Sequence, residues 1–131
     1  MPLRLTLRKR EILRGYQSFS TILSKGRSLQ AGTVRCYFLV GQGKGRGVKV
    51  GFAVSRSIRE SVARNRLRRF LREAYRMNKQ ILLKAGIERA HKVELVLMCA
   101  PAAETNPKRL TYDSIERLVI SLLTDVSRQL S

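Results

Sequence analysis

Apolar and polar residues alternate along two stretches of the chain, and this alternation predicts two β-strands. In residues 33–40 and 48–55 nearly every second side chain is apolar, which is typical of strands that bury one face. Residues 93–99 are almost entirely apolar and predict a third strand, central in its sheet. The side chains expected on the core face of the first two strands are Val34, Cys36, Phe38, Val40, Val48, Val50, Phe52 and Val54. Those expected on the opposite face of the first strand are Arg35, Tyr37 and Leu39.

Apolar residues spaced three and four apart predict three helices. The first covers residues 16–24 and is closed by Gly26, the second runs from 61 to about 83 with Gly86 as its stop, and the third begins within residues 111–113. Their apolar faces comprise Phe19, Ile22 and Leu23 in the first, Ala63, Leu67, Phe70, Leu71 and Ala74 in the second, and Ile115, Leu118, Val119, Leu122, Leu123 and Val126 in the third.

Short polar side chains near two of the helix starts have the spacing of N-caps, because their oxygens accept hydrogen bonds from free backbone N–H groups. Ser57 or Ser61 would cap the second helix. Asp113 and Glu116 have the spacing of a capping box at the third. Residues 1–14 are basic and form either an ordered arm or a frayed tail.

Glycine recurs in residues 41–47, between the first two strands. A phosphate cradle would need a following helix and a Walker or dinucleotide pattern, and neither is present, so we interpret this stretch as a flexible hairpin loop. The order helix, strand, strand, helix, strand, helix predicts one α+β domain over residues 1–131. Its expected architecture is a two-layer α/β sandwich with a small mixed sheet of about four strands and helices at both ends of the chain.

The second helix has a face opposite its apolar side that carries almost only cations. That face holds Arg64, Asn65, Arg68, Arg69, Arg72 and Arg76. The nearest acids are Glu60 and Glu73, which we expect to orient arginines. Solvated helix faces usually alternate the sign of charge, whereas a uniformly positive i,i+4 series repels itself. Guanidinium groups bind phosphate through paired hydrogen bonds, so this face predicts a polyanionic partner over a merely solvated surface.

The overall charge supports a polyanionic partner, and the distribution of charge indicates which part of the chain binds it. The chain has 27 Lys and Arg against 9 Asp and Glu, a net charge of +18. Residues 1–100 hold 23 of the cations and 5 of the acids, so the C-terminal segment is expected to be a neutral scaffold. The polyanion would be DNA, RNA or an acidic membrane surface. Because 19 of the cations are Arg, we favour nucleic acid.

Aromatic and basic side chains are expected together on the non-core face of the first strand, where Tyr37 lies beside Arg35. Aromatic rings beside cations on a sheet bind single-stranded nucleic acid by stacking and charge. Phe19 on the first helix would line the same groove. The alternative is that this helix packs on the sheet and buries both rings; it stays open for Phe19, while for Tyr37 we favour the groove.

The sequence offers little for a protein-borne active site. The one histidine, His91, falls in an expected loop and is interpreted as a surface residue, and no Ser-His-acid set or metal-ligand spacing is found. Cys36 and Cys99 lie within strand patterns and are interpreted as small buried hydrophobic residues. Without a secretory or membrane-spanning pattern, the expected location is the cytoplasm, with no membrane partner.

Two stretches together resemble the protein subunit of bacterial ribonuclease P. Residues 49–56 have the sequence Lys-Val-Gly-Phe-Ala-Val-Ser-Arg, and residues 62–76 have Val-Ala-Arg-Asn-Arg-Leu-Arg-Arg-Phe-Leu-Arg-Glu-Ala-Tyr-Arg. The Arg-Asn-Arg centre with its flanking Arg-Arg and Arg-Glu matches the signature of that family. The positions that extend the resemblance over most of the chain are Phe19, Gly26, Tyr37, Thr111 and Tyr112.

The resemblance implies an RNA-binding subunit of a ribonucleoprotein that removes the 5′ leader from precursor tRNA. Its partners would be the catalytic RNA and precursor tRNA, and the active site with its Mg²⁺ ions would lie in the RNA, with no catalytic or metal-binding protein side chain. The residues implied to contact the catalytic RNA are Arg56, Arg64, Asn65, Arg66, Arg68, Arg69, Arg72 and Arg76. Those implied to line a leader cleft are Phe19, Leu23, Arg35 and Tyr37. A left-handed strand-helix-strand crossover around the signature helix is also implied.

The chain departs from the pattern of the family at four places. Arg56 and Ser57 replace paired lysines, Arg59 and Glu60 replace Gly-Asn, Leu23 replaces a second cleft aromatic, and Ala100 replaces an Arg. These changes predict an altered loop before the helix and weaker stacking in the cleft, with the helix signature intact. Two other functional classes remain as alternatives: a basic ribosomal or DNA-binding structural protein, and an independent nuclease.

Overall fold

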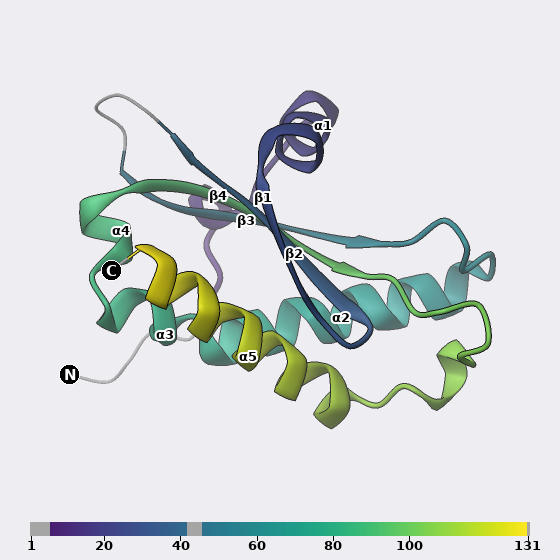
Figure 1. Cartoon of the computed structure of the whole chain (residues 1–131). Coiled ribbons are helices and arrows are strands. Elements are labelled where there is room, and N and C mark those ends of the chain that lie inside the picture. The colour runs from purple at the N-terminus through teal and green to yellow at the C-terminus, as the bar shows by residue number, and fades with distance from the viewer. Residues whose placement is uncertain (1–5, 42–45, 131) are drawn as a thin grey trace.

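The computed structural model describes residues 6–41 and 46–130, which form a mixed sheet with helices on both faces. The elements in chain order are η1 (Lys9–Glu11), α1 (Tyr16–Lys25), β1 (Arg27–Ala31), β2 (Val34–Gly41), β3 (Gly47–Val54), α2 (Ser61–Asn78), α3 (Gln80–Lys84), α4 (Ile87–Ala90), β4 (Lys92–Cys99), η2 (Pro107–Arg109) and α5 (Tyr112–Leu130). In Figure 1, α2 and α5 lie together under one face of the sheet and α1 lies above the other. The predicted α+β architecture is confirmed.

The strand order is β1-β2-β4-β3, so the third predicted strand lies in the interior of the sheet as expected. β4 pairs antiparallel with β2 and parallel with β3, and α2 connects the two parallel strands. Leu95, Val96 and Leu97 are fully buried because both sheet faces are covered along this strand. The handedness of the β3-α2-β4 crossover stays a prediction.

The predicted hairpin between β2 and β3 is wrong, because β4 lies between these two strands. Strand pairing depends on burial as well as on closeness in sequence, and the most apolar strand takes the interior place. The connection therefore passes from one side of β4 to the other. Residues 42–45, within the glycine-rich stretch, lie outside the described residues.

β1 is an edge strand that the apolar pattern does not indicate. It pairs antiparallel with β2, opposite Tyr37 and Arg35 among others. Only Leu29 and Ala31 of β1 pack against the main core, and the rest of the strand is polar. The chain turns from β1 into β2 at Gly32, whose φ of +56° lies in the left-handed region that glycine adopts without strain.

The main core lies between the sheet and the pair α2 and α5. The apolar faces predicted for the strands and for these two helices meet there, with Phe52, Val54, Phe70 and Leu118 half-buried at its margin. Val40 is half-buried and lies outside this cluster, which corrects its predicted place in the core. Fully burying a Leu, Ile or Phe side chain contributes about 1.5–3 kcal/mol. α2 therefore has one fixed orientation, with Leu67 and Leu71 inward at 0% exposure.

The long second helix predicted to about residue 83 is interrupted after Asn78. The Asn78 amide donates hydrogen bonds to the Ala74 carbonyl at 2.8 Å and to Glu116 of α5 at 3.1 Å. A side chain that binds backbone carbonyls competes with helix continuation. Lys79 then turns inward, and α3 and α4 follow, separated by Gly86 with φ +75°. Gly86 thus ends α3, a separate short helix.

Neither predicted serine caps α2. The N-cap residue is Glu60, whose side chain makes no capping hydrogen bond, and Ser61 is already helical. The Ser57 hydroxyl lies 2.9 Å from the Ser55 hydroxyl instead. These two serines therefore stabilise the turn after β3, not the first turn of the helix.

The capping box predicted at the last helix is wrong in its residues, although the helix starts where expected. The Thr111 hydroxyl accepts a hydrogen bond from the Ser114 N–H at 3.2 Å, and the Ser114 hydroxyl accepts one from the Thr111 N–H at 3.2 Å. This reciprocal pair is a capping box formed by Thr111 and Ser114, two residues earlier in the chain than the predicted one. Glu116 instead accepts a hydrogen bond from the Tyr112 hydroxyl at 3.0 Å.

The N-terminal arm is ordered over its described part. Residues 6–13, which we call the strap, run along the edge strand β3. The Leu13 N–H donates to the Val50 carbonyl at 2.8 Å, and the Leu13 side chain is buried. Lys79 holds the strap from the other side through its ammonium group. The strap therefore covers the edge of the sheet that would otherwise be unpaired.

The two cysteines are expected to be unreactive in the native protein. Cys36 and Cys99 are both fully buried, and burial raises the pKa of the Cys36 thiol to about 12 and that of the Cys99 thiol to about 11. Only the thiolate attacks disulfide reagents, so a colorimetric disulfide reagent at pH 8 should label neither thiol in the native protein and both in guanidinium chloride. Rapid labelling of either thiol in the native protein would contradict this burial.

Candidate nucleic-acid interface

The basic face of α2 points away from the core, as the sequence predicts. Asn65, Arg68, Arg69 and Arg72 are exposed, and Arg64, Arg66 and Arg76 are half-buried. Within the described part of the chain, no acid lies within 4.0 Å of Arg64, Arg68, Arg69 or Arg72. The core fixes the helix that carries these four arginines, so their side chains extend from one side of it and form a continuous cationic surface.

Arg76 differs from the other arginines because it has an acidic partner. Its guanidinium donates to the Glu73 carboxylate through Nε at 3.2 Å and through a terminal nitrogen at 2.8 Å. These hydrogen bonds lower the pKa of the Glu73 carboxyl, with burial opposing them. The prediction that Glu73 orients an arginine is confirmed, and it makes Arg76 the most compensated cation of the face.

Glu60 does not orient an arginine. Its carboxylate lies 3.8 Å from the Lys108 ammonium, and both side chains are largely exposed, so this pair contributes little to stability. The contact nevertheless places η2 beside the start of α2. Lys108 and Arg109 therefore add positive charge at this end of the helix, although the C-terminal segment is neutral as a whole. No sequence signal indicated this, since the two segments are far apart in the chain.

Two residues of the Arg-Asn-Arg centre have specific neighbours. The Arg66 guanidinium lies over the Phe70 ring, 4.7 Å from its centroid, on the flank of α2 that packs against α5. Arg68 donates a hydrogen bond to the Asn65 amide oxygen at 3.1 Å on the exposed flank. Arg66 is thus oriented by a cation–π contact, while Asn65 and Arg68 form an exposed pair that can meet a ligand together.

Arg56 lies on a fixed turn just before α2. The Ser55 N–H donates to the Cys99 carbonyl at 2.9 Å, and the Ile58 N–H donates to the Ser55 carbonyl at 3.1 Å. The Ile58 side chain is buried and anchors the far side of the turn. Arg56 and Arg59 are exposed between these anchors, so the turn presents cations ahead of the helix.

A second surface lies on the outer face of the sheet, beside α1. Leu13, Ile22 and Val96 are buried there, and Phe19 and Tyr37 pack against them while remaining half-buried. The structure therefore combines the two alternatives that the sequence left open. Both rings take part in docking α1 on the sheet, and both keep part of their surface exposed.

Gly51 explains how Phe19 is seated. A Cβ atom added to Gly51 would lie 2.3 Å from the Phe19 Cζ atom, so the ring rests directly on the strand backbone. This role was not predicted, because a glycine within a strand pattern does not reveal what approaches it. Arg35 is exposed on the same sheet face as Tyr37, whereas Leu23 remains 38% exposed and lies outside the cluster that contains Phe19 and Tyr37.

The other candidate chemistry is sparse among the residues that the structure describes. Those residues contain no group of three metal-ligating side chains and no helix long and apolar enough to cross a membrane. His91 is half-buried after α4, and its Nε2 atom lies 3.1 Å from the Leu130 carbonyl oxygen. This histidine thus has a structural contact with the end of α5.

Comparisons with known proteins agree with these features. A family model described as Ribonuclease P matches residues 7–123. The ribonuclease P protein component of Alkaliphilus metalliredigens is 29% identical over 111 residues, covering 85% of this chain and 88% of that protein. The component of Pelotomaculum thermopropionicum is 41% identical over 70 residues, covering 53% of this chain and 61% of that protein. In this second match the chain thus spans less than two thirds of its relative.

Solved structures show the same fold at low sequence identity. The ribonuclease P protein from Thermotoga maritima superposes with a TM-score of 0.70 at 23% identity, over 88% of this chain and 97% of that one. The protein from Staphylococcus aureus gives a TM-score of 0.67 at 16% identity, over 92% and 98%. The matched family model spans the strap from residue 7 on, both surfaces described above and most of α5. The chain therefore belongs to the ribonuclease P protein family.

Proposed function

We propose that this chain is the RNA-binding subunit of a ribonuclease P ribonucleoprotein, which removes the 5′ leader from precursor tRNA. In this proposal the exposed arginines of α2 and of the turn before it bind the catalytic RNA. The observation that carries it is the set of Arg64, Arg68, Arg69 and Arg72, which have no acidic partner in the described part of the chain and lie on a helix that the core holds fixed. Membership of the family disfavours a ribosomal or DNA-binding structural role.

The outer face of the sheet is the surface proposed for the leader. A single strand needs cations for its phosphates and aromatic faces for its bases. The exposed Arg35 and the half-buried Tyr37 and Phe19 supply both on one side of the molecule. Leu23 is expected to contribute only apolar contact at the margin of this surface.

The hydrolytic step is proposed to belong to the RNA, together with its Mg²⁺ ions. The described side chains include no cluster with the oxygen ligands that Mg²⁺ prefers, so no protein residue is given a catalytic or metal-binding role. The contribution of the protein is to lower the cost of bringing two polyanions together. Its cations replace part of the counterions that the RNAs would otherwise need.

Cleavage of precursor tRNA by the cognate catalytic RNA tests this function. At low Mg²⁺, adding the protein is expected to raise kcat/KM, because cations of the protein then supply the missing charge neutralisation. At high Mg²⁺ the difference should shrink. No stimulation at any Mg²⁺ concentration, or cleavage by the protein without RNA, would contradict the proposal.

Changing Tyr37 to alanine is expected to weaken binding of precursor tRNA by roughly fivefold, at the low end of about 1–3 kcal/mol per stacked base because the ring is only half exposed. The matched control is mature tRNA, which has no leader, bound to the same holoenzyme. Equilibrium binding of both RNAs should show the loss for precursor tRNA alone. An equal loss of affinity for both RNAs would show that the Tyr37 change disturbs the fold of the protein and does not remove a contact with the leader.

A further inference from the structure

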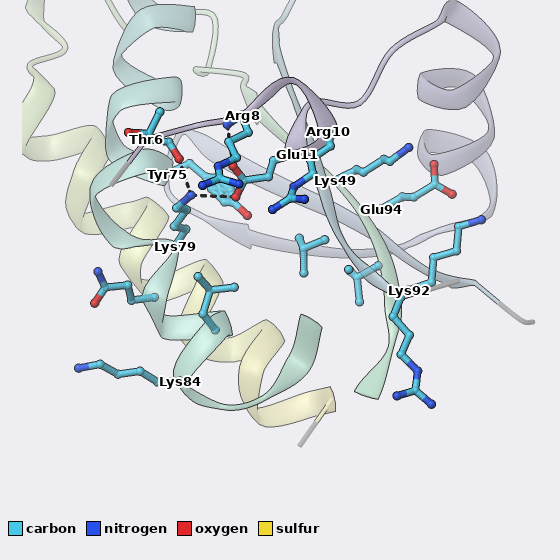
Figure 2. Close-up of a pocket in the computed structure, with 16 residues that line it drawn as sticks. Thr6, Arg8, Arg10, Glu11, Lys49, Tyr75, Lys79, Lys84, Lys92 and Glu94 are labelled. Carbon is cyan, nitrogen blue, oxygen red and sulfur yellow. Dashed lines mark hydrogen bonds and ion pairs between the residues drawn. The ribbon is translucent and has the colours of Figure 1, made fainter. Parts of the chain in front are cut away.

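A third basic surface, distinct from the arginine face of α2 and from the leader surface, lies at the opposite end of α2 from the turn that carries Arg56. It is a hollow of about 1000 Å³ between the strap, the first residues of β3 and β4, and the chain from the end of α2 through α3. Figure 2 shows Arg8 and Arg10 reaching from the strap over this hollow, with Lys84 on its far side. No residue that we place in the RNA-binding face of α2 or in the leader surface lines it.

The upper wall of the hollow is firmly built. The Lys79 ammonium donates to the Thr6 carbonyl at 2.7 Å and to the Glu11 carboxylate at 2.8 Å, and the whole Lys79 residue is only 4% exposed. The Arg8 N–H donates to the other carboxylate oxygen of Glu11 at 2.6 Å. Lys79 is buried and Glu11 is half-buried, and their ion pair with these further hydrogen bonds ties the strap to the end of α2.

The charge lining the hollow is strongly unbalanced. Apart from Lys79, its cations are Arg8, Arg10, Arg46, Lys49, Lys84 and Lys92. Within the described residues, none of these six has an acid within 4.0 Å. Glu11 is already used by Lys79, which leaves Glu94 as the other acid of the lining. Figure 2 shows Arg8 and Arg10 together on the strap side of the hollow, whereas Lys49 and Lys92 extend toward the side of Glu94. The like charges of Arg8 and Arg10 repel one another, and an anionic ligand relieves that repulsion.

The size and the apolar floor of the hollow indicate a ligand that is larger than a single small anion. The half-buried Leu83 contributes apolar surface beneath the cationic rim, while Val48 and Val93 line the hollow at 9% and 1% exposure. A volume of about 1000 Å³ is at the upper end of ligand pockets, which range over roughly 300–1,000 Å³. A ligand that carries phosphates together with rings fits this combination of rim and floor, whereas a bare phosphate would leave the floor uncovered.

We propose that this hollow binds one or two nucleotides of a single-stranded RNA segment, with phosphates at Arg8 and Arg10 and with sugar or base over Leu83. The site lies apart from the arginine face of α2 and from the leader surface, so it gives the protein a third RNA contact. The proposal depends on the proposed function only in taking RNA as the partner. A free nucleotide has the same chemistry and is distinguished by the test.

Photocrosslinking of the full-length protein to a tetranucleotide that carries 4-thiouridine tests the site directly. The crosslinked peptides are expected to contain residues 75–84 or 92–94, which line the hollow. Crosslinks confined to α1 and β2, at the leader surface, would overturn the proposal.

Uridine monophosphate and inorganic pyrophosphate serve as competitors in the same crosslinking reaction. Competition by the mononucleotide at equal or lower concentration than the tetranucleotide indicates a free nucleotide, and competition by pyrophosphate alone indicates a simple anion site; either result overturns RNA binding.

Affinity measurements on matched variants complete the test. Arg10 and Lys84 are exposed, so changing both to alanine should leave the fold intact while weakening tetranucleotide binding by roughly tenfold at low salt. The control changes Lys25 and Arg117, two exposed cations that do not line the hollow, and should bind as the wild type does. Equal affinity of the Arg10 and Lys84 variant and the control would refute the site. Binding of that variant to the catalytic RNA through α2 would still be measurable, so failure here is distinct from failure of the proposed function.

Discussion

Replacing Arg68 and Arg72 together with alanine is expected to lower the affinity for the catalytic RNA by roughly 10- to 100-fold at physiological salt, because two charge-assisted phosphate contacts are lost. The slope of the logarithm of the binding constant against the logarithm of salt concentration should fall in magnitude by roughly 1.4–1.8, at about 0.7–0.9 for each contact. Both side chains are exposed, so the free energy of unfolding should change by no more than about 0.5 kcal/mol. Filter binding over a salt series and urea denaturation measure the two quantities.

The control for this experiment is the variant with Lys25 and Arg117 changed to alanine, which removes the same charge from α1 and α5. If affinity depended only on net charge, both variants would lose affinity equally. A specific interface on α2 requires a larger loss and a larger change of slope for the Arg68 and Arg72 variant. Equal behaviour of the two variants would show that RNA binds the general positive field of the protein and not the face of α2.

The arginine face could be predicted from the sequence because it depends on a local property. In a helix, residues three and four apart share a face, so the apolar positions that include Leu67 and Leu71 determine where Arg68 and Arg72 point. The same reasoning identified the core faces of β2 and β3. These predictions needed only periodicity and charge, which a single sequence displays in full.

The features that were not predicted depend on contacts between distant segments. Where the long helix is interrupted, Lys79 turns toward Thr6 and Glu11, and no local pattern reveals a partner 73 or 68 residues away. The position of β4 between β2 and β3 is likewise a matter of which strand gains most from burial on both faces. Lys108 reaches the start of α2 only through the path of the loop after β4. Such contacts created the strap, the hollow beneath it and the enlarged basic surface.

Changing Gly51 to alanine is expected to destabilise the protein by about 1–3 kcal/mol through overpacking against Phe19. The φ angle of Gly51 is not in the left-handed region, so the strand itself would tolerate alanine. Alanine at this position without a steric conflict would be neutral or slightly stabilising, because it restricts the unfolded chain. The expected loss therefore arises from one contact, the added Cβ atom 2.3 Å from the Phe19 ring. Urea denaturation measures it.

A double-mutant cycle with Phe19→Ala isolates that contact. Phe19→Ala alone removes the packing of a half-buried ring and lowers stability, but it also empties the space above Gly51. Gly51→Ala should then cost nothing in the Phe19→Ala background, so the coupling energy should approach the full 1–3 kcal/mol or so of the single change. Equal losses of stability in both backgrounds would mean that the backbone of β3, and not the Phe19 ring, limits which residue fits at position 51.

The Gly51→Ala change should also affect RNA binding, because it displaces the Phe19 ring and Phe19 shares one surface with Tyr37. The affinity for precursor tRNA should fall more than the affinity for mature tRNA.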